Sequence, residues 1–595
     1  MKLRMFLRLG FFAFFDILLS FLSFFSAYLL RFNFEIPEQF FYGLWRYFLA
    51  FSALKIICFY SVGLYKIPWR FFSLDGLKKL VLSHILAYGI FVGFLASNFW
   101  LNFAVLPIFP KSIPFIDGAI SMILIGMFRI SRRFFSDAQI FREKSENIAI
   151  FGANENGERQ FRSLDRVKYR VRFFIETDLA RINLKIHNLP VIAPENIAKF
   201  AEKYGVNTAI VAIEDNTQIK KIYELLHSAG IKNIKIARSA MDDYEAQPLK
   251  IEDLLARNPK DLDKNLITNF VKNNKVLITG AGGSIGSELA RMAQKYGAKE
   301  LILLDSGEYN LYAIGEELPN AKLKMINVVD RDKIFALFLD EKPDIIIHAA
   351  AYKHVPLVEL NMQSAIVNNI LGTKNCIDAA LNSRAKSFVL ISSDKAVRPT
   401  SVMGATKRVC ELYLQNVSRD QPQHARTRLL AVRFGNVLGS SGSVVPKFRK
   451  LIEENRPLTV THPEITRYFM LTSEAAELVL QSGALAEGGE VFVLDMGKPV
   501  KIADLAQKML DLSGKPELGV VFTGLRAGEK LYEELLLDTG EKATKYPSIF
   551  VGKRVDYDFA LLERQIAALS DAADIPAALK EIVPEFNHNK NGDLK

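Results

Sequence analysis

Hydrophobic residues are concentrated at the start of this 595-residue chain. Four apolar stretches lie at residues 9–30, 44–65, 80–101 and 113–130. Each has about the 20 residues that a helix needs to cross a bilayer core. The first stretch is too long for a signal peptide, and no small-residue cleavage site follows it. The pattern predicts a four-helix transmembrane anchor over residues 1–135.

Beyond residue 145 the pattern changes to short β-branched runs that alternate with amphipathic stretches. NIAIFGA, VRFFIE, NTAIVAI and IKNIKIA predict strands, and PENIAKFAEKYG and NTQIKKIYELLHSAG predict helices between them. This alternation is typical of a parallel α/β unit, here over residues 145–245. Its first turn, FGANENGE, has only Gly152 and Gly157. We expect a degenerate Rossmann-like domain with a packing or regulatory role, and a second nucleotide site is the alternative.

A stronger pattern of the same kind follows a polar connector at residues 246–273 and covers residues 274–595. KVLITGAGGSIGSELARMAQKYG predicts a strand, a glycine turn and a helix in the order that a dinucleotide needs. Gly280, Gly283 and Gly286 let phosphates approach the backbone at the helix N-terminus, with Ser284 and Ile285 between them. The expected fold is therefore a helical transmembrane anchor plus two Rossmann-like parallel-sheet units.

The strands after the glycine turn add three further parts of a dinucleotide site. ELILLD ends in Asp305, where a carboxylate accepts hydrogen bonds from ribose hydroxyls and repels a 2′-phosphate, so NAD is favoured over NADP. NVVDRD places Asp330 at a third strand end, where an adenine edge can be read. A fourth strand ends in Ala349 and Ala350, beside which the cofactor can lie.

The next strand, SFVLISSDKAV, brings Ser393, Asp394 and Lys395 to the edge of the sheet where ligands bind in such folds. The helix after it carries Met403 and Lys407, which share one face because they are four residues apart. An arbitrary Asp–Lys pair at a strand end is usually a solvated ion pair, but the position beside the nicotinamide favours catalysis. Because the thioether of Met403 cannot transfer a proton, acid–base work falls to its neighbours.

Charge and cysteine usage exclude several function classes. Most of the formal net charge of +11 comes from the first 144 residues, where Lys and Arg flank the apolar stretches, so we do not expect nucleic-acid binding. Cys58, Cys376 and Cys410 are far apart, which argues against a disulfide framework or a thiolate metal site. We expect no metal.

Basic residues also predict the orientation of the anchor. Three loops carry them: Lys2, Arg4 and Arg8 before the first stretch, Lys66, Arg70, Lys78 and Lys79 between the second and third, and Arg132, Arg133 and Arg142 after the fourth. By the positive-inside rule both termini are cytoplasmic, and everything after about residue 135 faces the cytosol. Asp16 and Lys55 lie inside spans, where we expect one structural ion pair and a transport pathway is the alternative.

The chain resembles the membrane-bound nucleoside-diphosphate-sugar 4,6-dehydratases of bacterial polysaccharide and protein-glycosylation pathways, an extended short-chain dehydrogenase/reductase family. The segments that carry the resemblance are TGAGGSIGSEL, HAAAYKHVP, SSDKAVRPTSVMGATKR, RFGNVLGSSGSVVPKF, TRYFM and GLRAGEKLYEEL. The resemblance is closest to the branch that acts on UDP-N-acetylglucosamine in bacterial N-glycosylation, which also has Met where soluble relatives keep Tyr. Ser393 departs from the Thr of many relatives but keeps the hydroxyl.

The resemblance implies a reaction in which hydride passes from carbon 4 of a hexose to NAD and returns at carbon 6 after water has left. It implies Asp394 as acid toward the carbon-6 hydroxyl, Lys395 as base at carbon 5, Ser393 as a hydrogen-bonding group near the carbon-4 oxygen, and Lys407 on the nicotinamide ribose. A basic Lys395 needs a lowered pKa, which desolvation or Lys407 would provide. The acceptor of the carbon-4 hydroxyl proton is left open between Asp394 and a water.

The resemblance also implies a substrate site. Positions that match a nucleotide and diphosphate clamp are Asn436, Arg467, Arg526 and Glu529, and Lys353 and His354 are candidates for the sugar pocket. Arginine suits a diphosphate because its planar fork makes paired, charge-assisted hydrogen bonds. A single His is more often structural.

The implied activity is conversion of a UDP-hexose, first of all UDP-N-acetylglucosamine, to the 2-acetamido-2,6-dideoxy-4-keto product for bacterial glycan synthesis. The alternatives are a sugar-nucleotide 4-epimerase and an inactive NAD-binding membrane scaffold. The expected location is the bacterial inner membrane, with the catalytic domain in the cytosol. The expected partners are the UDP-sugar, a second copy of the chain bound through the cytosolic domain, and a downstream aminotransferase.

Overall fold

The computed structural model describes residues 2–67, 69, 72–101, 109–140, 145–165, 168–213, 218–240, 243–255, 262–421, 427–534 and 542–589. The chain divides into two compact units. One is Met1–Glu146 with Asp165–Arg170, and the other is Asn147–Leu164 with Val171–Lys595.

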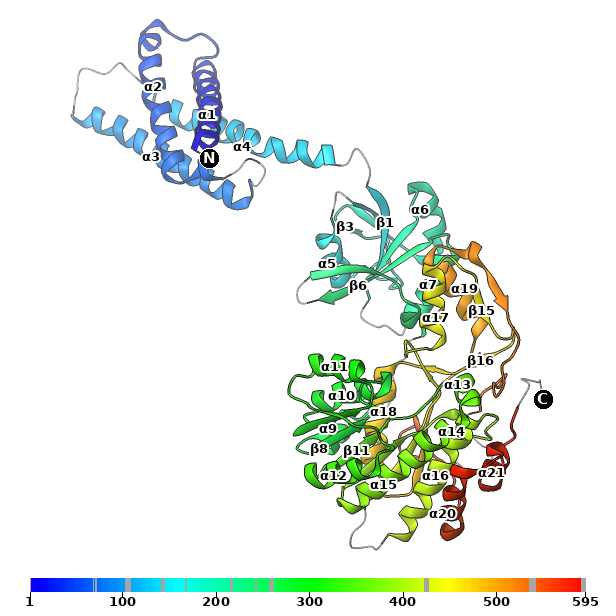
Figure 1. Ribbon diagram of the computed structural model, residues 1–595. Helices are drawn as coiled ribbons and strands as arrows, with labels where there is room; N and C mark the ends of the chain where they lie inside the picture. The colour runs from blue at the N-terminus through cyan, green and yellow to red at the C-terminus, as the bar shows by residue number, and fades with distance from the viewer. Residues whose placement is uncertain are drawn as a thin grey trace. The chain divides into compact units, whose positions relative to one another are not determined.

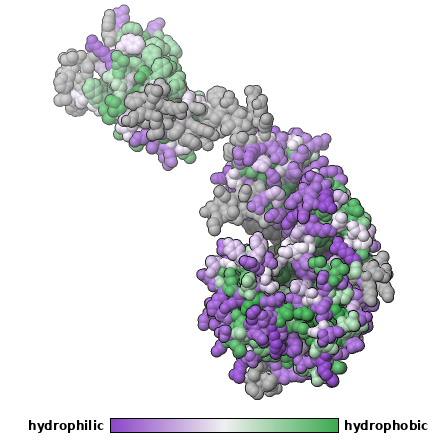
Figure 2. Space-filling view, in the orientation of Figure 1, coloured by the Kyte–Doolittle hydropathy of each residue, from purple (hydrophilic) through white to green (hydrophobic). Residues whose placement is uncertain are grey.

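Four long apolar helices make up the first unit (Figure 1). They are α1 Lys2–Arg31, α2 Glu38–Ser61, α3 Leu74–Leu101 and α4 Ile113–Ile140. Each contains a segment long and apolar enough to cross a membrane, as the sequence predicts. Figure 2 shows hydrophobic side chains gathered over this unit, and Phe14, Leu49 and Ile85 are among the large apolar side chains exposed there. Outward apolar side chains are what lipid-facing helices require.

Two buried ion pairs join these helices, where the sequence led us to expect one. Lys55 Nζ lies 2.9 Å from Asp117 Oδ2, and Arg129 Nη2 lies 2.6 Å from Asp16 Oδ2. The expectation that Asp16 pairs with Lys55 was therefore wrong. Both partners come from α4, on which Asp117 and Arg129 are separated by about 18 Å at 1.5 Å per residue.

Asp117 is the point at which all four helices meet. Its carboxylate accepts hydrogen bonds from Ser23 on α1, from Lys55 on α2 at 2.9 Å, and from the Tyr88 hydroxyl on α3 at 2.6 Å. A buried charge is costly unless it is paired and hydrogen-bonded. The three donors meet that requirement and make a structural role the simpler interpretation of these polar residues.

The structure describes only part of the basic residues that predict orientation. Arg70 and Arg142 lie outside the described residues, and so do the side chains of Lys2, Arg4, Arg8, Arg132 and Arg133. Lys66, Lys78 and Lys79 are exposed beyond the ends of α2 and at the start of α3.

In the second unit, seven strands of the described residues form a sheet in the order β3-β4-β2-β1-β5-β6-β7. The strands are β1 Glu146–Phe151, β2 Tyr169–Ile175, β3 Lys185–Ile186, β4 Leu189–Ile192, β5 Thr208–Val211, β6 Asn233–Ala240 and β7 Asp243–Pro248. The helices are α5 Glu155–Ser163, α6 Ile197–Tyr204, α7 Ile219–Ser228 and α8 Ile251–Leu255. β1, β5 and β6 are parallel, as predicted, whereas the antiparallel β6–β7 pair at the edge was not foreseen.

This first sheet packs against the C-terminal part of the chain. One hydrophobic core contains Ile222 and Leu226 of α7 together with Phe448 and Leu510, which lie on α17 (Val444–Glu453) and α19 (Ile502–Ser513). Figure 1 shows α7, α17 and α19 side by side. The shared core fits the packing role expected for the degenerate domain.

A second sheet has nine strands among the described residues, in the order β10-β9-β8-β11-β12-β13-β18-β22-β21. Its strands are β8 Lys275–Thr279, β9 Glu300–Asp305, β10 Lys322–Met325, β11 Ile345–His348, β12 Ser387–Ile391, β13 Arg428–Arg433, β18 Glu490–Leu494, β21 Lys542–Ala543 and β22 Ile549–Val551. The strands from β10 to β18 are parallel, and β22 and β21 are antiparallel additions. The order reverses between β8 and β11, which is where such sheets bind ligands.

Helices cover both faces of this sheet (Figure 1). They are α9 Lys264–Val271, α10 Ser284–Lys295, α11 Glu308–Glu317, α12 Arg331–Glu341, α13 Val355–Leu360, α14 Met362–Ala365, α15 Gly372–Asn382, α16 Val402–Asp420, α18 Thr472–Leu485, α20 Phe559–Ala568 and α21 Ile575–Ile582. The fold class predicted from the sequence, apolar helices followed by Rossmann-like parallel sheets, is confirmed.

The connector predicted at residues 246–273 contains a packed helix. Ile267 and Phe270 of α9 belong to the core under the second sheet. Asp263, just before α9, accepts a hydrogen bond from the Tyr546 hydroxyl at 2.7 Å, and its own amide donates to Gln481 Oε1 at 2.9 Å. α9 is thus part of the larger fold.

The C-terminal part is built from insertions after β13 and β18. Besides α17 and α19 it has three short strand pairs: β14 Asn436–Val437 with β17 Phe469–Met470, β15 Leu458–Val460 with β20 Val520–Phe522, and β16 Thr466–Arg467 with β19 Val500–Lys501. These pairs hold residues of two distant segments close to the carboxyl ends of the parallel strands.

Candidate active site

A cavity of about 830 Å³ opens at the carboxyl ends of β8, β11 and β12. Its walls come from the glycine turn, from the segments after β11 and β12, from α16 and from the C-terminal part. The expected cofactor residues that line it are Gly280, Gly283, Ser284, Ile285, Gly286, Ala349 and Lys407. The expected substrate residues Lys353, His354, Asn436, Arg467, Arg526 and Glu529 line it as well.

The glycine turn packs against neighbouring backbone so closely that side chains would not fit at two of its positions. Gly280 has φ +65°, and a Cβ there would lie 2.7 Å from the Ala350 amide nitrogen. A Cβ on Gly286 would lie 2.1 Å from the Gly280 carbonyl oxygen. Because α10 begins at Ser284, its first amide groups are free of helical partners and suit phosphate oxygens. The turn therefore fits the diphosphate of a dinucleotide.

The two acidic residues expected at the cofactor have different surroundings. Asp305 ends β9, and its carboxylate accepts hydrogen bonds from the amides of Gly282 at 2.9 Å and Gly307 at 2.8 Å. It therefore lies beside the glycine turn. Asp330 is not at a strand end, because β10 ends at Met325. It caps α12, where it accepts from the Lys333 amide at 3.3 Å and pairs with the Lys333 ammonium group at 2.8 Å.

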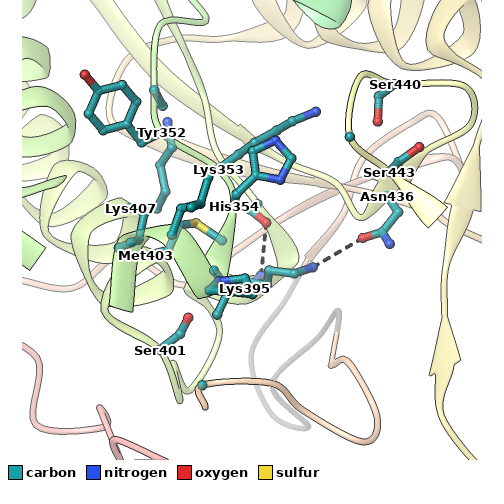
Figure 3. A pocket seen from close by; sticks show the side chains of 18 of the residues that line it. Tyr352, Lys353, His354, Lys395, Ser401, Met403, Lys407, Asn436, Ser440 and Ser443 are labelled. Atoms are coloured by element: carbon teal, nitrogen blue, oxygen red, sulfur yellow. Dashed lines mark hydrogen bonds between the residues drawn. The ribbon is translucent and has the colours of Figure 1, made fainter. Parts of the chain in front are cut away.

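Met403 and Lys407 lie on the first turns of α16, as their spacing predicts (Figure 3). The hydroxyl of Ser401 caps this helix by accepting a hydrogen bond from the Gly404 amide at 3.2 Å. Met403 is buried in the cavity wall and offers no proton donor or acceptor. Lys407 Nζ donates to the Ile391 carbonyl at 2.9 Å, and burial lowers the pKa of Lys407.

Lys395 is held by three acceptors. Its Nζ lies 3.0 Å from Asp394 Oδ1, 3.2 Å from Glu533 Oε1 and 3.3 Å from Asn436 Oδ1. Figure 3 shows the side chains of Lys395 and Asn436 pointing toward one another. The Ser393 hydroxyl donates to Asp394 Oδ1 at 2.9 Å. Three acceptors match the three N–H donors of an ammonium group.

The charges around Lys395 oppose the pKa that the sequence led us to expect. Burial lowers the pKa of Lys395, but the carboxylates of Asp394 and Glu533 outweigh it and hold the pKa above its usual value. The expected lowering was therefore wrong. Its physical reason is Glu533, a second carboxylate that the sequence analysis did not include. Burial raises the pKa of Asp394, and Glu533 raises it further in spite of the Lys395 charge.

Asp394 lies behind Lys395 and does not itself line the cavity. It is 1% exposed, and its Oδ2 has no hydrogen-bond partner among the described residues. A Cβ on Gly435 would lie 3.1 Å from that oxygen. Ser393 and Lys395 therefore face the cavity, and Asp394 contacts both of them on the side away from the cavity.

Comparison with known proteins identifies the family. Residues 276–554 match the family model described as "Polysaccharide biosynthesis protein". The chain is 43% identical to the probable polysaccharide biosynthesis protein EpsC of Bacillus subtilis over 77% of its own length and 79% of that protein. The chain belongs to this family.

Two further relatives of the chain have names that state a reaction. A UDP-N-acetylglucosamine 4,6-dehydratase (inverting) of Campylobacter jejuni is 32% identical over 54% of the chain and 99% of that protein. A UDP-glucose 4-epimerase of Rickettsia rickettsii is 31% identical over 50% of the chain and 89% of that protein. The family member is thus related to sugar-nucleotide dehydratases and epimerases of the short-chain dehydrogenase/reductase kind.

The expected substrate residues form two groups in the cavity wall of the family member. Arg467 lies on β16, where its guanidinium contacts Glu529 Oε1 at 3.3 Å and Glu533 Oε1 at 3.6 Å. Arg526 is on the loop that also carries Glu529. The other group is Lys353 and His354, and Asn436 belongs to neither group because its Oδ1 contacts Lys395 Nζ at 3.3 Å.

Lys353 and His354 follow β11 and line the cavity (Figure 3). A Cβ on Gly442 would lie 2.4 Å from His354 Cε1, so the ring packs directly on that glycine. Burial lowers the pKa of Lys353, and burial with the nearby Lys353 charge lowers that of His354.

A buried charge network behind Ser392 was also missed. Ser392 Oγ donates to Glu411 at 2.7 Å, Arg433 binds both oxygens of Glu411 at 2.7 and 2.5 Å, and Arg408 donates at 3.1 Å. Burial alone would raise the pKa of Glu411, but the two guanidinium groups hold it below its usual value. This network joins β12, α16 and β13. Its members carry no motif that would have distinguished them in the sequence.

Proposed function

We propose that this chain catalyses the NAD-dependent 4,6-dehydration of a UDP-hexose, with UDP-N-acetylglucosamine as the first candidate, for bacterial glycan synthesis. The observation that carries the proposal is Lys395, hydrogen-bonded to Asp394 in the cavity wall beside Met403. An acid–base pair at this place supplies what dehydration requires. The named reaction of the Campylobacter jejuni relative supports both the reaction and the substrate.

We propose NAD as the cofactor, bound by the glycine turn, Asp305 and Lys407. The turn fits because Gly280 and Gly286 pack so closely on neighbouring backbone that no Cβ could be accommodated, and this close packing holds the N-terminus of α10 at the place where a diphosphate binds in such folds. Asp305 supports NAD over NADP because its carboxylate would repel a 2′-phosphate. When bound, NAD accepts a hydride and gives it back, so the complete reaction consumes no oxidant.

One proton transfer prepares Lys395 and Asp394 for their roles. A proton that moves along the 3.0 Å hydrogen bond from Lys395 to Asp394 leaves a neutral amine and a carboxylic acid. The amine then takes the carbon-5 proton, and the acid protonates the departing carbon-6 hydroxyl, which leaves as water. As hydride reaches carbon 6, the Lys395 ammonium group returns a proton to carbon 5. The proton that left the carbon-4 hydroxyl then restores the Lys395–Asp394 ion pair. Positioned groups of this kind contribute ~10²–10⁴-fold each.

Ser393 offers a route between Asp394 and the substrate. Asp394 does not line the cavity, whereas Ser393 does, and their side-chain oxygens are 2.9 Å apart. A hydroxyl both donates and accepts, so Ser393 can pass the proton of Asp394 to the carbon-6 hydroxyl. The carbon-4 hydroxyl proton goes to a water, or to Asp394 with the Lys395 proton leaving to a water instead, since Met403 cannot accept it.

For the nucleotide part of the substrate we propose Arg467 and Arg526 as the clamp of the diphosphate, with Asn436 and Glu529 beside them. Glu529 contacts Arg467 and partly neutralises it, so a diphosphate would compete for the same guanidinium. Positions beside the sugar are assigned to Lys353 and His354.

The two other candidate functions make different demands. A 4-epimerase, as named for the Rickettsia rickettsii relative, returns hydride to carbon 4 and removes no carbon-5 proton, so the Lys395–Asp394 pair would have no task. An inactive scaffold would bind NAD without turnover. The ion pair of buried Asp394 with Lys395, which faces the cavity, favours dehydration over both, because a buried charge without a role is costly.

We further propose that the four helices span the bacterial inner membrane with both ends in the cytosol, and that the cytosolic part forms a homo-oligomer. A downstream aminotransferase would consume the 4-keto product. All residues of the cavity follow residue 279, so a chain that starts near residue 135 should be soluble and active. Loss of turnover in a folded, NAD-binding chain of that length would show that the anchor contributes to chemistry.

The decisive experiment incubates the full-length protein with a panel of nucleotide sugars and follows each by mass spectrometry. Loss of one water from a UDP-hexose supports the proposal, with Lys395→Ala as the matched control that should form no such product. A product of unchanged mass but altered configuration would favour the epimerase. No product from an NAD-loaded protein would favour the scaffold.

A further inference from the structure

Glu533 is a buried carboxylate in the wall of the cavity, just beyond the loop that carries Arg526 and Glu529. Its side chain is 2% exposed. Oε1 lies 3.2 Å from Lys395 Nζ and 3.6 Å from Arg467 Nε, and Oε2 has no hydrogen-bond partner among the described residues. One carboxylate thus connects the proposed base with the proposed diphosphate clamp.

The surroundings keep Glu533 ionised. Burial raises its pKa, but the positive charges of Lys395, Arg467 and Lys530 outweigh burial and hold the pKa below its usual value. The charged groups that face Lys395 are Asp394 and Glu533 on the negative side and Arg467 and Lys530 on the positive side.

If the proposed dehydration is correct, Asp394 cannot be a charged partner of Lys395 throughout the reaction cycle. In that reaction Asp394 takes up a proton before the carbon-6 hydroxyl departs and gives that proton to the hydroxyl. Asp394 is therefore negatively charged for only part of the cycle. A lysine side chain has several rotatable bonds, so its amine moves away from a position once the charged partner there has been neutralised. A second acceptor with constant charge is required to keep the amine at carbon 5.

We propose that Glu533 is a positioning residue for Lys395: its constant carboxylate holds the Lys395 amine in the cavity wall through the whole cycle and joins it to Arg467. This inference rests on the proposed function. It adds a link between the two ends of the substrate site, because a diphosphate that draws Arg467 away from Glu533 leaves the carboxylate to Lys395 alone.

The neighbouring residue provides a matched control. Glu534 pairs with the guanidinium of Arg398 at the surface, where both side chains are largely exposed. It is not among the residues that line the cavity. Glu534→Gln therefore removes the same charge from the next position of the same segment, without touching Lys395.

The first test measures Lys395 itself and does not depend on turnover. Full-length protein in detergent, loaded with NAD, is treated with formaldehyde and a borohydride reductant at fixed pH, and methylation of Lys395 is followed by peptide mass spectrometry. The Lys395 side chain is 21% exposed and so within reach of a small reagent. Only the neutral amine reacts.

Glu533→Gln should speed the methylation of Lys395 by about tenfold or more, because loss of the adjacent carboxylate lowers the pKa of Lys395 and so raises the fraction of neutral amine. Glu534→Gln should leave the rate unchanged. Arg467→Gln should slow methylation, because it removes a positive charge that faces Lys395 and leaves Glu533 to interact with Lys395 alone. Both effects raise the pKa of Lys395. Equal rates in wild type and Glu533→Gln would overturn the proposal, and so would faster methylation in Arg467→Gln. If Glu533→Gln does not retain NAD, the Arg467→Gln result decides.

The second test uses turnover. Glu533→Gln should lower kcat by about a hundredfold through misplacement of the amine, with a small change in KM. Its pH–rate profile should move to lower pH, because removal of the negative charge lowers the pKa of both Lys395 and Asp394. Glu533→Asp keeps the charge and should keep the position of the wild-type profile. If the pH–rate profile moves equally in Glu533→Gln and Glu533→Asp, the negative charge of Glu533 does not determine its position, which would contradict the proposal.

The two tests separate this inference from the proposed function. If the wild type dehydrates no nucleotide sugar, the proposed function fails, while the methylation rates still report whether Glu533 and Arg467 govern Lys395. If the wild type dehydrates and the methylation rates do not respond, the role of Glu533 fails alone.

Discussion

Lys395 Nζ and Asp394 Oδ1 lie 3.0 Å apart, with the lysine facing the cavity and the aspartate buried behind it. This arrangement lets one proton move between a potential base and a potential acid without passing through solvent. It also means that loss of either residue stops a different step of the proposed reaction.

Lys395→Ala should remove carbon-5 deprotonation and leave carbon-4 oxidation in place. Product formation should fall by ~10²–10⁴-fold, which is the usual contribution of a positioned general base. Absorbance of the reduced cofactor should then accumulate on substrate addition. Dehydration by Lys395→Ala at nearly the wild-type rate would contradict the assignment.

Asp394→Asn is the counterpart of that change and should also stop dehydration. Exchange of the carbon-5 proton with deuterium from solvent should persist if the carbon-4 proton leaves to a water and Lys395, without the Asp394 carboxylate, loses its own proton to solvent. If Asp394 is its acceptor, neither exchange nor reduced cofactor should appear. Deuterium exchange measured by mass spectrometry therefore identifies the acceptor that Met403 cannot be.

Met403 should matter little, although it occupies the place of the usual proton carrier. Met403→Ala is expected to keep turnover in a folded, NAD-bound protein, since the thioether takes no part in proton transfer. Met403→Tyr should be no better than the wild type, because Lys395 and Asp394 already do the acid–base work. Steady-state rates of the two variants test this, and complete loss of activity in Met403→Ala would count against it.

Asp305 should determine the choice of cofactor. Asp305→Ala removes a charge that repels a 2′-phosphate and a carboxylate that binds the Gly282 amide at 2.9 Å. We expect weaker NAD binding and a smaller preference for NAD over NADP, measured by titration calorimetry. Asp330→Ala is the control, because Asp330 caps α12 and any contact with adenine would affect both cofactors equally. A wild-type preference for NADP would remove the assignment.

Glu411 should stabilise the region behind the cavity in a pH-dependent way. Its pKa is held below the usual value, so its contribution is present at neutral pH and is lost as pH falls below about 4 toward the folded-state pKa. Glu411→Gln leaves buried Arg433 without its partner, which costs roughly 3–5 kcal/mol.

The midpoint of thermal unfolding of the full-length protein checks this prediction. The difference between wild type and Glu411→Gln should be largest at neutral pH and should shrink on acidification. Glu464→Gln breaks an exposed pair with Lys501 and should change the midpoint little at any pH. If the difference in unfolding midpoint between wild type and Glu411→Gln grows as the pH falls, the prediction is contradicted.

Much of the cofactor end of the site could be predicted because it is encoded locally. Gly280 and Gly286 lie on one turn, and their need for space follows from the strand and helix on either side. Met403 and Lys407 share a helix face by spacing alone. The sequence misplaces Asp330 because NVVDRD resembles the end of a strand, whereas β10 ends at Met325 and the aspartate caps the next helix.

The contacts that the sequence did not reveal are all between distant segments. Glu533 reaches Lys395 from a loop of the C-terminal part, and nothing in the letters YEEL distinguishes it from Glu534. Likewise, hydropathy predicts the spans but not which helices pair, so Asp117 and Arg129 could not be assigned as partners of Lys55 and Asp16. Such contacts depend on tertiary packing rather than on local pattern.

The most direct measurement of the central claim follows one hydrogen through the reaction. UDP-N-acetylglucosamine with deuterium at carbon 4 is incubated with the full-length protein, and the product is analysed by mass spectrometry and NMR. The account predicts that the deuterium appears on carbon 6 of a product that has lost one water. Deuterium that returns to carbon 4 of a product of unchanged mass, or that is lost to solvent, would contradict it.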